Sequence, residues 1–181
     1  MLQQTQVSRV AEYYPRFLEQ FPDLATLAAA PARAVREAWD GLGYYARARN
    51  LHLLARTVTR RHDATPGLLP QQPAELMKLP GIGPYTAGAV ACFAYEKPVP
   101  AVDTNVARVL RRVFYDDRAV TMRRIWSTAA KLVPKDGKTA WRFNQAVMEL
   151  GAVMCRARTP NCKQCPVRQE CRTGKAGRID A

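Results

Sequence analysis

Apolar and polar residues alternate along the chain with the period of an α-helix rather than that of a β-strand. In residues 3–21 the apolar side chains fall three or four positions apart, as at Val10, Tyr14 and Phe17, which places them on one face of a helix. Proline and glycine interrupt the pattern often, so the helices and their connections are short. The expected helices cover residues 3–21, 24–30, 31–39, 44–61, 73–78, 84–95, 105–114, 122–133 and 139–153. The pattern therefore predicts an all-α fold of nine or ten helices with a cysteine-bearing tail.

The composition narrows the class of protein. The chain has 181 residues, of which 48% are hydrophobic, and this is enough for a sizeable core and argues against general disorder. No run approaches the roughly 18 apolar residues of a membrane span. Residues 1–15 lack the apolar segment of a signal peptide. We therefore expect a cytoplasmic protein rather than a membrane or secreted one.

The charge narrows the class of partner. The chain carries 28 Lys and Arg against 15 Asp and Glu, a net charge of +13. Such a surplus indicates an anionic partner, with nucleic acid the first candidate and an anionic membrane surface the second. Residues 47–61 hold five arginines and no acid, residues 108–124 hold six arginines, and the tail from Cys155 holds seven basic residues. A single cluster would be an ordinary solvated helix face, but three clusters predict a shared phosphate-binding face.

Four of the five cysteines have the spacing Cys155-x6-Cys162-x2-Cys165-x5-Cys171. Four thiolates this close together can surround one metal centre, either a zinc ion or a [4Fe–4S] cluster. Only the central pair has the CxxC spacing, which differs from the two CxxC pairs of a zinc ribbon. We therefore predict a metal site at these four residues. The fifth cysteine, Cys92, lies in an apolar run and is expected in the core.

A glycine-rich turn joins two of the expected helices, with the sequence Leu79-Pro80-Gly81-Ile82-Gly83-Pro84-Tyr85-Thr86. Two glycines around one aliphatic residue allow a tight turn whose backbone can approach another molecule closely. The free N–H groups at the start of the following helix would favour an anion. The turn is similar to the hairpin of the helix–hairpin–helix motif, which holds DNA phosphate without reading sequence. An ordinary tight turn is the alternative.

Asp103 follows an apolar stretch and precedes a helix rich in valine and leucine. The simplest interpretation is that its carboxylate caps that helix. A carboxylate in this position can also face a cleft and stabilise positive charge that develops on a substrate. The two roles are compatible.

The turn at 79–86, the segment Val102–Leu110 and the cysteine spacing together resemble the endonuclease III superfamily of DNA glycosylases. Within it, residues 1–7 (MLQQTQV) and 41–50 (GLGYYARARN) are similar to adenine DNA glycosylases of the MutY type. The resemblance implies a two-lobed helix–hairpin–helix glycosylase fold with a C-terminal iron–sulfur cluster loop. The implied parts are a helical core at 1–154 with its hairpin at 79–86, a cluster loop at 155–171 and a basic tail at 172–181.

The resemblance also implies an activity, namely base excision repair by a monofunctional adenine DNA glycosylase. Its substrate would be double-stranded DNA with adenine mispaired with 8-oxoguanine or guanine, and it would act as a nucleoid-associated monomer on a base flipped out of the stack. Asp103 matches the family's catalytic carboxylate, and Asn105 matches the asparagine after it. Tyr85 stands where strand-cleaving relatives have a nucleophilic lysine, so no Schiff base can form there. The implied cofactor at the four cysteines is a [4Fe–4S] cluster, with zinc as the alternative.

Several residues are expected to bind DNA. Gln3 and Gln4 match the family's duplex-probing segment, and Tyr44 matches the aromatic side chain that wedges beside the lesion. The ordinary alternatives are a helix N-terminus for the glutamines and a core position for the tyrosine. The other expected DNA-binding residues are Arg47, Gly81, Ile82, Gly83 and Thr86.

The chain departs from the family pattern in ways that leave other functions open. Tyrosine at position 85 also occurs in thymine-mismatch relatives, and Thr104 replaces a glycine of many adenine glycosylases. A thymine or uracil mismatch glycosylase and a non-catalytic iron–sulfur DNA-binding paralogue are therefore the alternatives. The family's general-acid glutamate would precede Met1 by two residues, and its Nudix-like domain would follow the cluster loop. We expect a truncated enzyme that binds DNA and releases adenine poorly.

Overall fold

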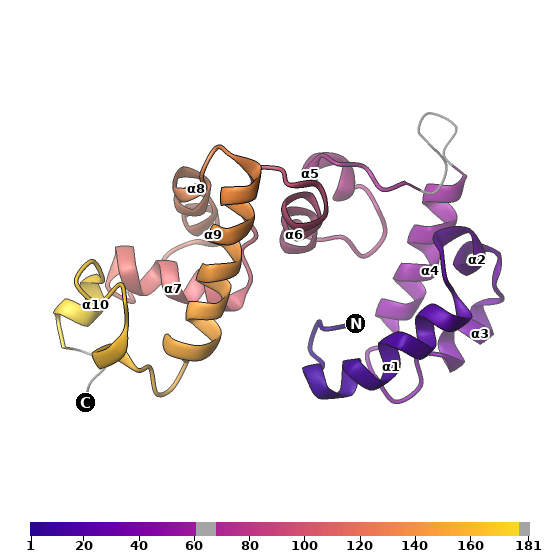
Figure 1. Ribbon diagram of the computed structural model, residues 1–181, viewed down its shortest axis with the longest axis horizontal. Helices are drawn as coiled ribbons and strands as arrows, with labels where there is room; N and C mark the ends of the chain where they lie inside the picture. Colours follow the sequence, from indigo (N-terminus) through magenta and orange to yellow (C-terminus); the bar gives the residue numbers. More distant parts are fainter. Residues whose placement is uncertain (61–67, 178–181) are drawn as a thin grey trace. The chain divides into compact units, whose positions relative to one another are not determined.

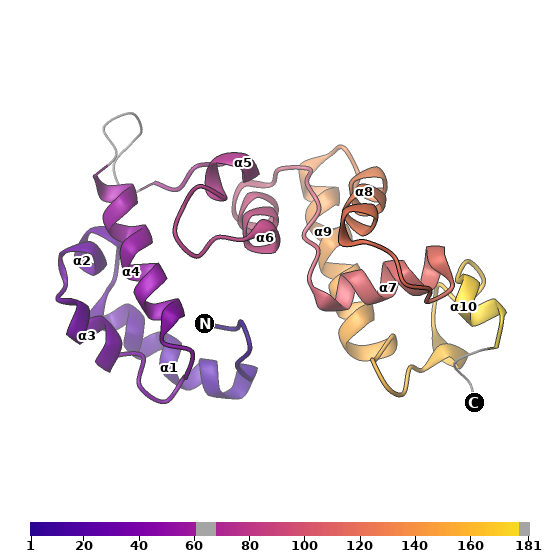
Figure 2. The ribbon, with the colours of Figure 1, turned by 180° about the vertical axis from the view of Figure 1, so that it is seen from behind.

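The computed structural model describes residues 1–60 and 68–177. Contacts divide the chain into two compact units, Met1–Pro70 with Ala74–Ile82 (unit 1) and Gln71–Pro73 with Gly83–Ala181 (unit 2). The described residues form ten α-helices, one π-helical turn and one 3-10 turn, and none of them lies in a β-strand (Figures 1 and 2). The all-α prediction is confirmed. None of the helices in these ranges has the length and apolar character needed to cross a membrane.

Unit 1 is built around Trp39, which is 1% exposed. Its ring meets Phe17 edge-on with the ring centroids 5.7 Å apart, and its Nε1 donates a hydrogen bond to the Gly43 carbonyl at 3.2 Å. The apolar faces of the surrounding helices close on this core because each has its buried side chains on one side. These helices are α1 (Val7–Gln20), α2 (Leu24–Ala29), α3 (Ala32–Glu37) and α4 (Ala46–Thr59). The short helix α5 (Pro73–Leu76) follows.

Unit 2 places two helices with strongly amphipathic sequences against each other. Val102, Val106 and Leu110 pack with Ile125 and Ala129 in its core. The earlier helix of the unit, α6 (Pro84–Tyr95), begins with proline at its first position and buries Cys92 completely, as expected. The others are α7 (Thr104–Tyr115), α8 (Met122–Leu132), α9 (Gly137–Glu149), the π-helical turn η1 (Leu150–Met154), the 3-10 turn η2 (Cys162–Gln164) and α10 (Arg172–Lys175).

The largest differences from the sequence prediction lie at the first helix, at the end of α9 and in the cysteine segment, and the other helix boundaries shift by at most two residues. The first helix begins at Val7 rather than residue 3, and Gln4 has a φ of 57° in the non-helical segment before it. The helix expected at 139–153 ends at Glu149 and continues as the wider turn η1, in which the Cys155 N–H bonds the Leu150 carbonyl at 2.7 Å. The short turns η2 and α10 were not predicted. Arg61 of the expected basic helix, and residues 178–181 of the expected tail, lie outside the described residues.

Candidate functional site

The Asp103 carboxylate caps helix α7 and is oriented by two hydrogen bonds. Its Oδ1 accepts from the Val106 N–H at 2.7 Å, and its Oδ2 accepts from the side-chain amide of Asn105 at 3.1 Å. Asp103 is half-buried. Because each oxygen has lone pairs beyond the one in use, the carboxylate can still face a developing positive charge.

Tyr85 lies within electrostatic reach of this carboxylate. It is the second residue of α6 and is half-buried. Burial, and then the charge of Asp103, raise the pKa of the Tyr85 phenol above its ordinary value of 10.0. The phenol is therefore a neutral hydrogen-bond donor at physiological pH. No lysine amine is present at this position to attack a sugar carbon.

The segment that leads into Asp103 is held by a residue that the sequence analysis did not identify. Asn144 of α9 is 3% exposed and uses its whole side-chain amide. Its oxygen accepts from the Ala101 N–H at 2.9 Å, and its nitrogen donates to the Val99 carbonyl at 3.0 Å and contacts the Cys92 sulfur at 3.3 Å. The only sign of this role in the sequence is an asparagine on the buried face of an expected helix.

Gly88 permits the close approach of α6 to the same segment. A Cβ at this position would lie 2.2 Å from the Pro100 carbonyl oxygen and 3.4 Å from the Ala101 Cα. Those atoms belong to the backbone and cannot move aside independently. Gly88 and Asn144 therefore fix the path of the chain just before Asp103.

A chain of hydrogen bonds runs from Asp103 to the end of the π-helical turn. Asn105 accepts through its side-chain oxygen from Arg108 Nη2 at 2.8 Å. The same guanidinium donates to the Gly151 carbonyl at 2.6 Å and to the Cys155 carbonyl at 2.7 Å. Arg108 therefore ties the Asp103–Asn105 pair to the backbone of the first cysteine, which makes it a positioning residue.

The glycine-rich turn has the backbone that its sequence predicts. Gly81 has a φ of 75°, and a Cβ there would lie 2.7 Å from the Cβ of Asn50, so a side chain would be both strained and crowded. The Ile82 N–H bonds the Leu79 carbonyl at 3.2 Å, which closes the turn. Gly83 precedes the first residue of α6 and has open space around it. Thr86 lies half-buried in the first turn of α6.

The four expected DNA-binding residues near the N-terminus all belong to unit 1. Gln3 and Gln4 are exposed, and Tyr44 is 62% exposed with a φ of 48°. Arg47 instead directs its guanidinium at protein atoms. It donates to the carbonyls of Met1, Gln3, Leu42 and Gly43 and to the Thr5 hydroxyl.

The surroundings of Arg47 explain how this basic residue is accommodated. Its guanidinium carbon lies 5.4 Å from the Trp39 ring centroid and 5.6 Å from that of Tyr44. Burial lowers the pKa of the Arg47 guanidinium. The side chain therefore fastens residues 1–5 to the Leu42–Tyr44 loop, and the side chains of Gln3, Gln4 and Tyr44 stay exposed.

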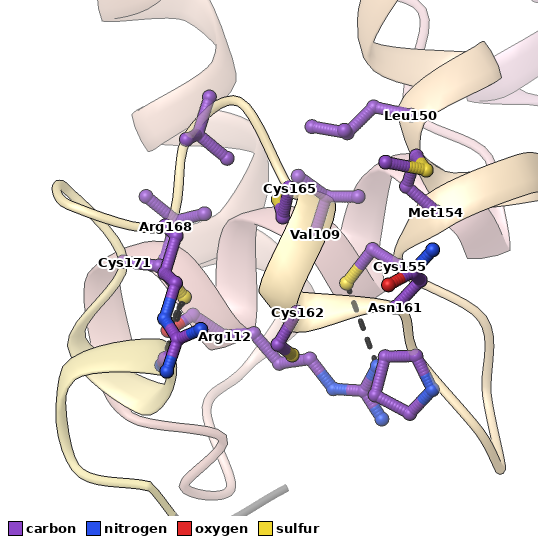
Figure 3. A pocket seen from close by; sticks show the side chains of 14 residues that line it. Val109, Arg112, Leu150, Met154, Cys155, Asn161, Cys162, Cys165, Arg168 and Cys171 are labelled. Carbon is purple, nitrogen blue, oxygen red and sulfur yellow. Dashed lines mark hydrogen bonds between the residues drawn. The ribbon is translucent and has the colours of Figure 1, made fainter. Parts of the chain in front are cut away.

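The four clustered cysteines of unit 2 line one pocket (Figure 3). All four thiols are free of disulfide bonds. Arg112 donates through Nη1 to the Cys155 sulfur at 3.4 Å, and the Gly174 N–H points to the Cys171 sulfur at 3.3 Å. Such donors stabilise thiolates. The donor set and its surroundings therefore fit a thiolate-bound metal group.

Other contacts hold the cysteine segment on helix α7. Arg112 also donates to the Arg156 and Ala157 carbonyls at 2.7 and 3.0 Å. The Thr173 hydroxyl, which is buried, donates to the Arg112 carbonyl at 2.8 Å. Among the described residues, no three His, Cys, Asp or Glu side chains lie close enough to hold a single metal ion.

Comparison with known families finds one match that covers most of the chain. The model of the HhH-GPD superfamily base excision DNA repair protein matches residues 1–135. The adenine DNA glycosylase of Mycolicibacterium smegmatis is 46% identical over 180 residues, which cover 98% of this chain and 59% of the relative. The adenine DNA glycosylase of Homo sapiens is 44% identical, over 95% of this chain and 32% of the relative. The chain thus spans about a third to three fifths of the length of these two relatives.

Solved structures with the same fold include complexes with DNA. A thermostable thymine-DNA glycosylase superposes with a TM-score of 0.85 at 29% identity, over 97% of this chain and 80% of that one. A non-covalent endonuclease III–DNA complex superposes with a TM-score of 0.81 at 29% identity, over 98% of this chain and 81% of that one. The likeness covers nearly every residue of the chain.

Proposed function

The chain belongs to the HhH-GPD superfamily of base excision DNA repair proteins, and from this membership we propose that it provides the glycosylase part of a monofunctional adenine DNA glycosylase. The proposed substrate is double-stranded DNA in which adenine is mispaired with 8-oxoguanine or guanine, bound by a monomer. The observation that carries the proposal is the half-buried Asp103 carboxylate that caps α7 and lies within electrostatic reach of position 85, which holds a tyrosine and not a lysine.

The proposed reaction uses Asp103 as a fixed negative charge. When the bond between the sugar C1′ and adenine N9 breaks, the bonding electrons leave with the base and positive charge develops on the sugar ring. A carboxylate already held by the Val106 N–H and the Asn105 amide stabilises that charge without reorienting. Water then adds to C1′ and loses a proton, while the base that leaves gains one.

The residue at position 85 decides what happens after the base leaves. A lysine amine could attack C1′ and lead to strand cleavage, but the Tyr85 phenol has no such nucleophilic nitrogen. The expected product is therefore an intact strand with an abasic site. We propose that Gln3, Gln4, Tyr44 and the hairpin contact the duplex. Arg47 would position the two glutamines by holding the carbonyls of Met1 and Gln3 and the hydroxyl of Thr5.

We propose that Cys155, Cys162, Cys165 and Cys171 hold a [4Fe–4S] cluster. The spacing of the four residues has one central CxxC pair and differs from the two CxxC pairs of a zinc ribbon. Four free thiols that line one pocket, with Arg112 Nη1 and the Gly174 N–H directed at two of the sulfurs, support a thiolate-bound cluster. When bound, the cluster would cross-link the loop; Arg112 and the Gly174 N–H would offset thiolate charge.

Base release from defined duplexes tests the proposal. Excess protein is incubated with DNA that contains adenine opposite 8-oxoguanine, and abasic sites are revealed by alkali. We expect release of adenine that Asp103→Asn abolishes. Equal release by the Asp103→Asn protein would overturn the assignment of the carboxylate.

A second candidate is a thymine or uracil mismatch glycosylase, which is favoured by the likeness to the thymine-DNA glycosylase structure. The same assay with thymine or uracil opposite guanine separates the two. Release of those bases, with adenine retained, would select the second candidate. Salt-dependent duplex binding without release of any base would select the non-catalytic DNA-binding alternative.

A further inference from the structure

Two residues of unit 1 have a backbone conformation that their side chains disfavour. Gln4 has a φ of 57° and Tyr44 a φ of 48°, in the left-handed region that residues other than glycine rarely adopt. The other described non-glycine residues with positive φ lie at the C-terminal ends of α6 and α7, where this conformation is common, and they are Glu96, Asp116 and Asp117. Gln4 and Tyr44 lie at no helix C-terminus, so another contact must hold them in this conformation.

The guanidinium of Arg47 holds the peptide group that precedes each of these two residues. It donates to the Gln3 carbonyl, which belongs to the peptide bond that leads into Gln4. It also donates, at 3.1 Å, to the Gly43 carbonyl, which belongs to the peptide bond that leads into Tyr44. The angle φ describes rotation just after that peptide bond, so fixing both carbonyls restricts the conformation of both residues.

The guanidinium is itself attached to the core of unit 1. Arg47 lies in the first turn of α4, and helical side chains point toward the N-terminus of their helix, which directs this one over the preceding loop. Its guanidinium carbon lies 5.4 Å from the ring centroid of Trp39, which is 1% exposed. Trp39 Nε1 donates to the same Gly43 carbonyl at 3.2 Å. The peptide before Tyr44 is therefore held by two donors, one of them from a core side chain.

The side chains carried on this unfavourable backbone are exposed. Tyr44 is 62% exposed, with its ring centroid 5.6 Å from the Arg47 guanidinium carbon, and Gln4 is also exposed. Glycine would adopt either backbone conformation more easily. Exposed side chains add little to the core, so their presence on strained backbone indicates a role toward a ligand.

We propose that Arg47 is a positioning residue that presets Gln4 and Tyr44 for a mismatched duplex. The proposal rests on the proposed function, which has these two side chains contact DNA, and it makes Arg47 act through both of them. Side chains that are already held in place lose less freedom when they bind. A mismatched step unstacks at lower cost than a paired one. A preset amide and aromatic ring should therefore favour the duplex that opens more easily.

Backbone NMR of the free protein tests the positioning role without a substrate. Arg47→Leu is expected to shift the signals of residues 3–5 and 42–44, because it removes the donor to five acceptors in these two segments. Arg47→Lys keeps the charge but lacks the guanidinium fork, so it is expected to shift the same signals. Arg49→Leu removes the same charge from an exposed position on α4 and is expected to leave them unchanged. Unchanged signals in both Arg47 variants would overturn the proposal.

Duplex binding tests what the positioning achieves. Two fluorescein-labelled duplexes are titrated at constant ionic strength, one with adenine opposite 8-oxoguanine and one fully paired. Arg47→Leu and Arg47→Lys are each expected to lower the ratio of the two affinities about tenfold, which is the usual scale for a charged hydrogen bond. Arg49→Leu should weaken both complexes equally and keep the ratio.

A multiple variant separates positioning from direct contact with DNA. In a chain that carries both Gln4→Ala and Tyr44→Ala, Arg47→Leu is expected to change the affinity ratio less than about twofold, because the side chains that it positions are absent. A further tenfold loss in that chain would show that Arg47 acts on the duplex itself and would refute the positioning role.

The outcomes also separate this proposal from the proposed function. A wild-type chain that prefers the mismatched duplex but releases no adenine would contradict the glycosylase assignment alone. A wild-type preference that persists in both Arg47 variants would contradict the role of Arg47 alone. Equal affinity of the wild-type chain for the two duplexes would contradict both the proposed substrate and the presetting of Gln4 and Tyr44 for it.

Discussion

Replacing Asn144 by leucine should destabilise unit 2 and loosen the segment before Asp103. The substitution keeps the approximate size of the side chain, so the main loss is that of hydrogen bonds. The Ala101 N–H would lose its acceptor in a residue that is fully buried, and the Val99 carbonyl would lose a donor. Each buried polar group left unpaired costs about 1–3 kcal/mol, and the half-buried Val99 carbonyl costs less. The expected decrease in the free energy of unfolding is therefore about 2–4 kcal/mol.

Hydrogen exchange measures this loss where it occurs. A loss of 2 kcal/mol corresponds to about 30-fold faster exchange of protected amides in residues 99–106, and urea unfolding should show a lower midpoint. Gln145→Leu, an exposed amide on the next residue of the same helix, is the matched control and should change stability by less than about 0.5 kcal/mol. A loss below 1 kcal/mol in Asn144→Leu, or equal losses in both variants, would refute the role assigned to the buried amide.

Three further predictions concern Gly151, the clustered cysteines and Tyr85. Gly151→Ala would place a Cβ 2.7 Å from the Asn105 Cβ. The substitution should lower the free energy of unfolding, measured in urea, by about 1–3 kcal/mol and should slow base release. Unchanged stability and release would contradict the close packing. Cys162→Ala should abolish iron content and broad visible absorption, whereas Cys92→Ala should keep both; zinc in a colourless wild-type protein would contradict the cluster. Because the pKa of the Tyr85 phenol is raised in the folded chain, the unfolded chain loses the phenol proton at a lower pH than the folded chain does. The free energy of unfolding should therefore fall as the pH rises above about 10. Tyr85→Phe should make this fall smaller.

The features that local sequence determines were predictable from it. Helix α6 was expected at 84–95 and occupies those residues, because Pro84 fixes its start. The cap on α7 was expected from an aspartate before a valine- and leucine-rich helix and is present. The four cysteines could be grouped because their sequence spacing is short, and they line one pocket.

The features that depend on distant partners could not be predicted. Asn144 bonds Val99 and Ala101, more than forty residues earlier, and nothing in its own helix indicates this. The acceptors of Arg47 include the carbonyls of Met1 and Gln3, also more than forty residues away, and its charge alone does not indicate them. The π-helical turn arises where α9 meets the start of the cysteine segment, and helical periodicity alone does not distinguish it from α-helix.

The cap formed by Asp103 affects how sequence change at this position would be tolerated in evolution. Loss of an N-cap side chain costs about 0.5–2 kcal/mol, but asparagine caps a helix about as well as aspartate. Drift to alanine would therefore be opposed by the fold even in a lineage that no longer needed the enzyme. Drift to asparagine would be opposed only by the need for a negative charge in the reaction proposed for Asp103. Under the role proposed for Asp103, a change to asparagine at this position in descendants of this chain would mark the loss of catalysis while the helix cap is kept.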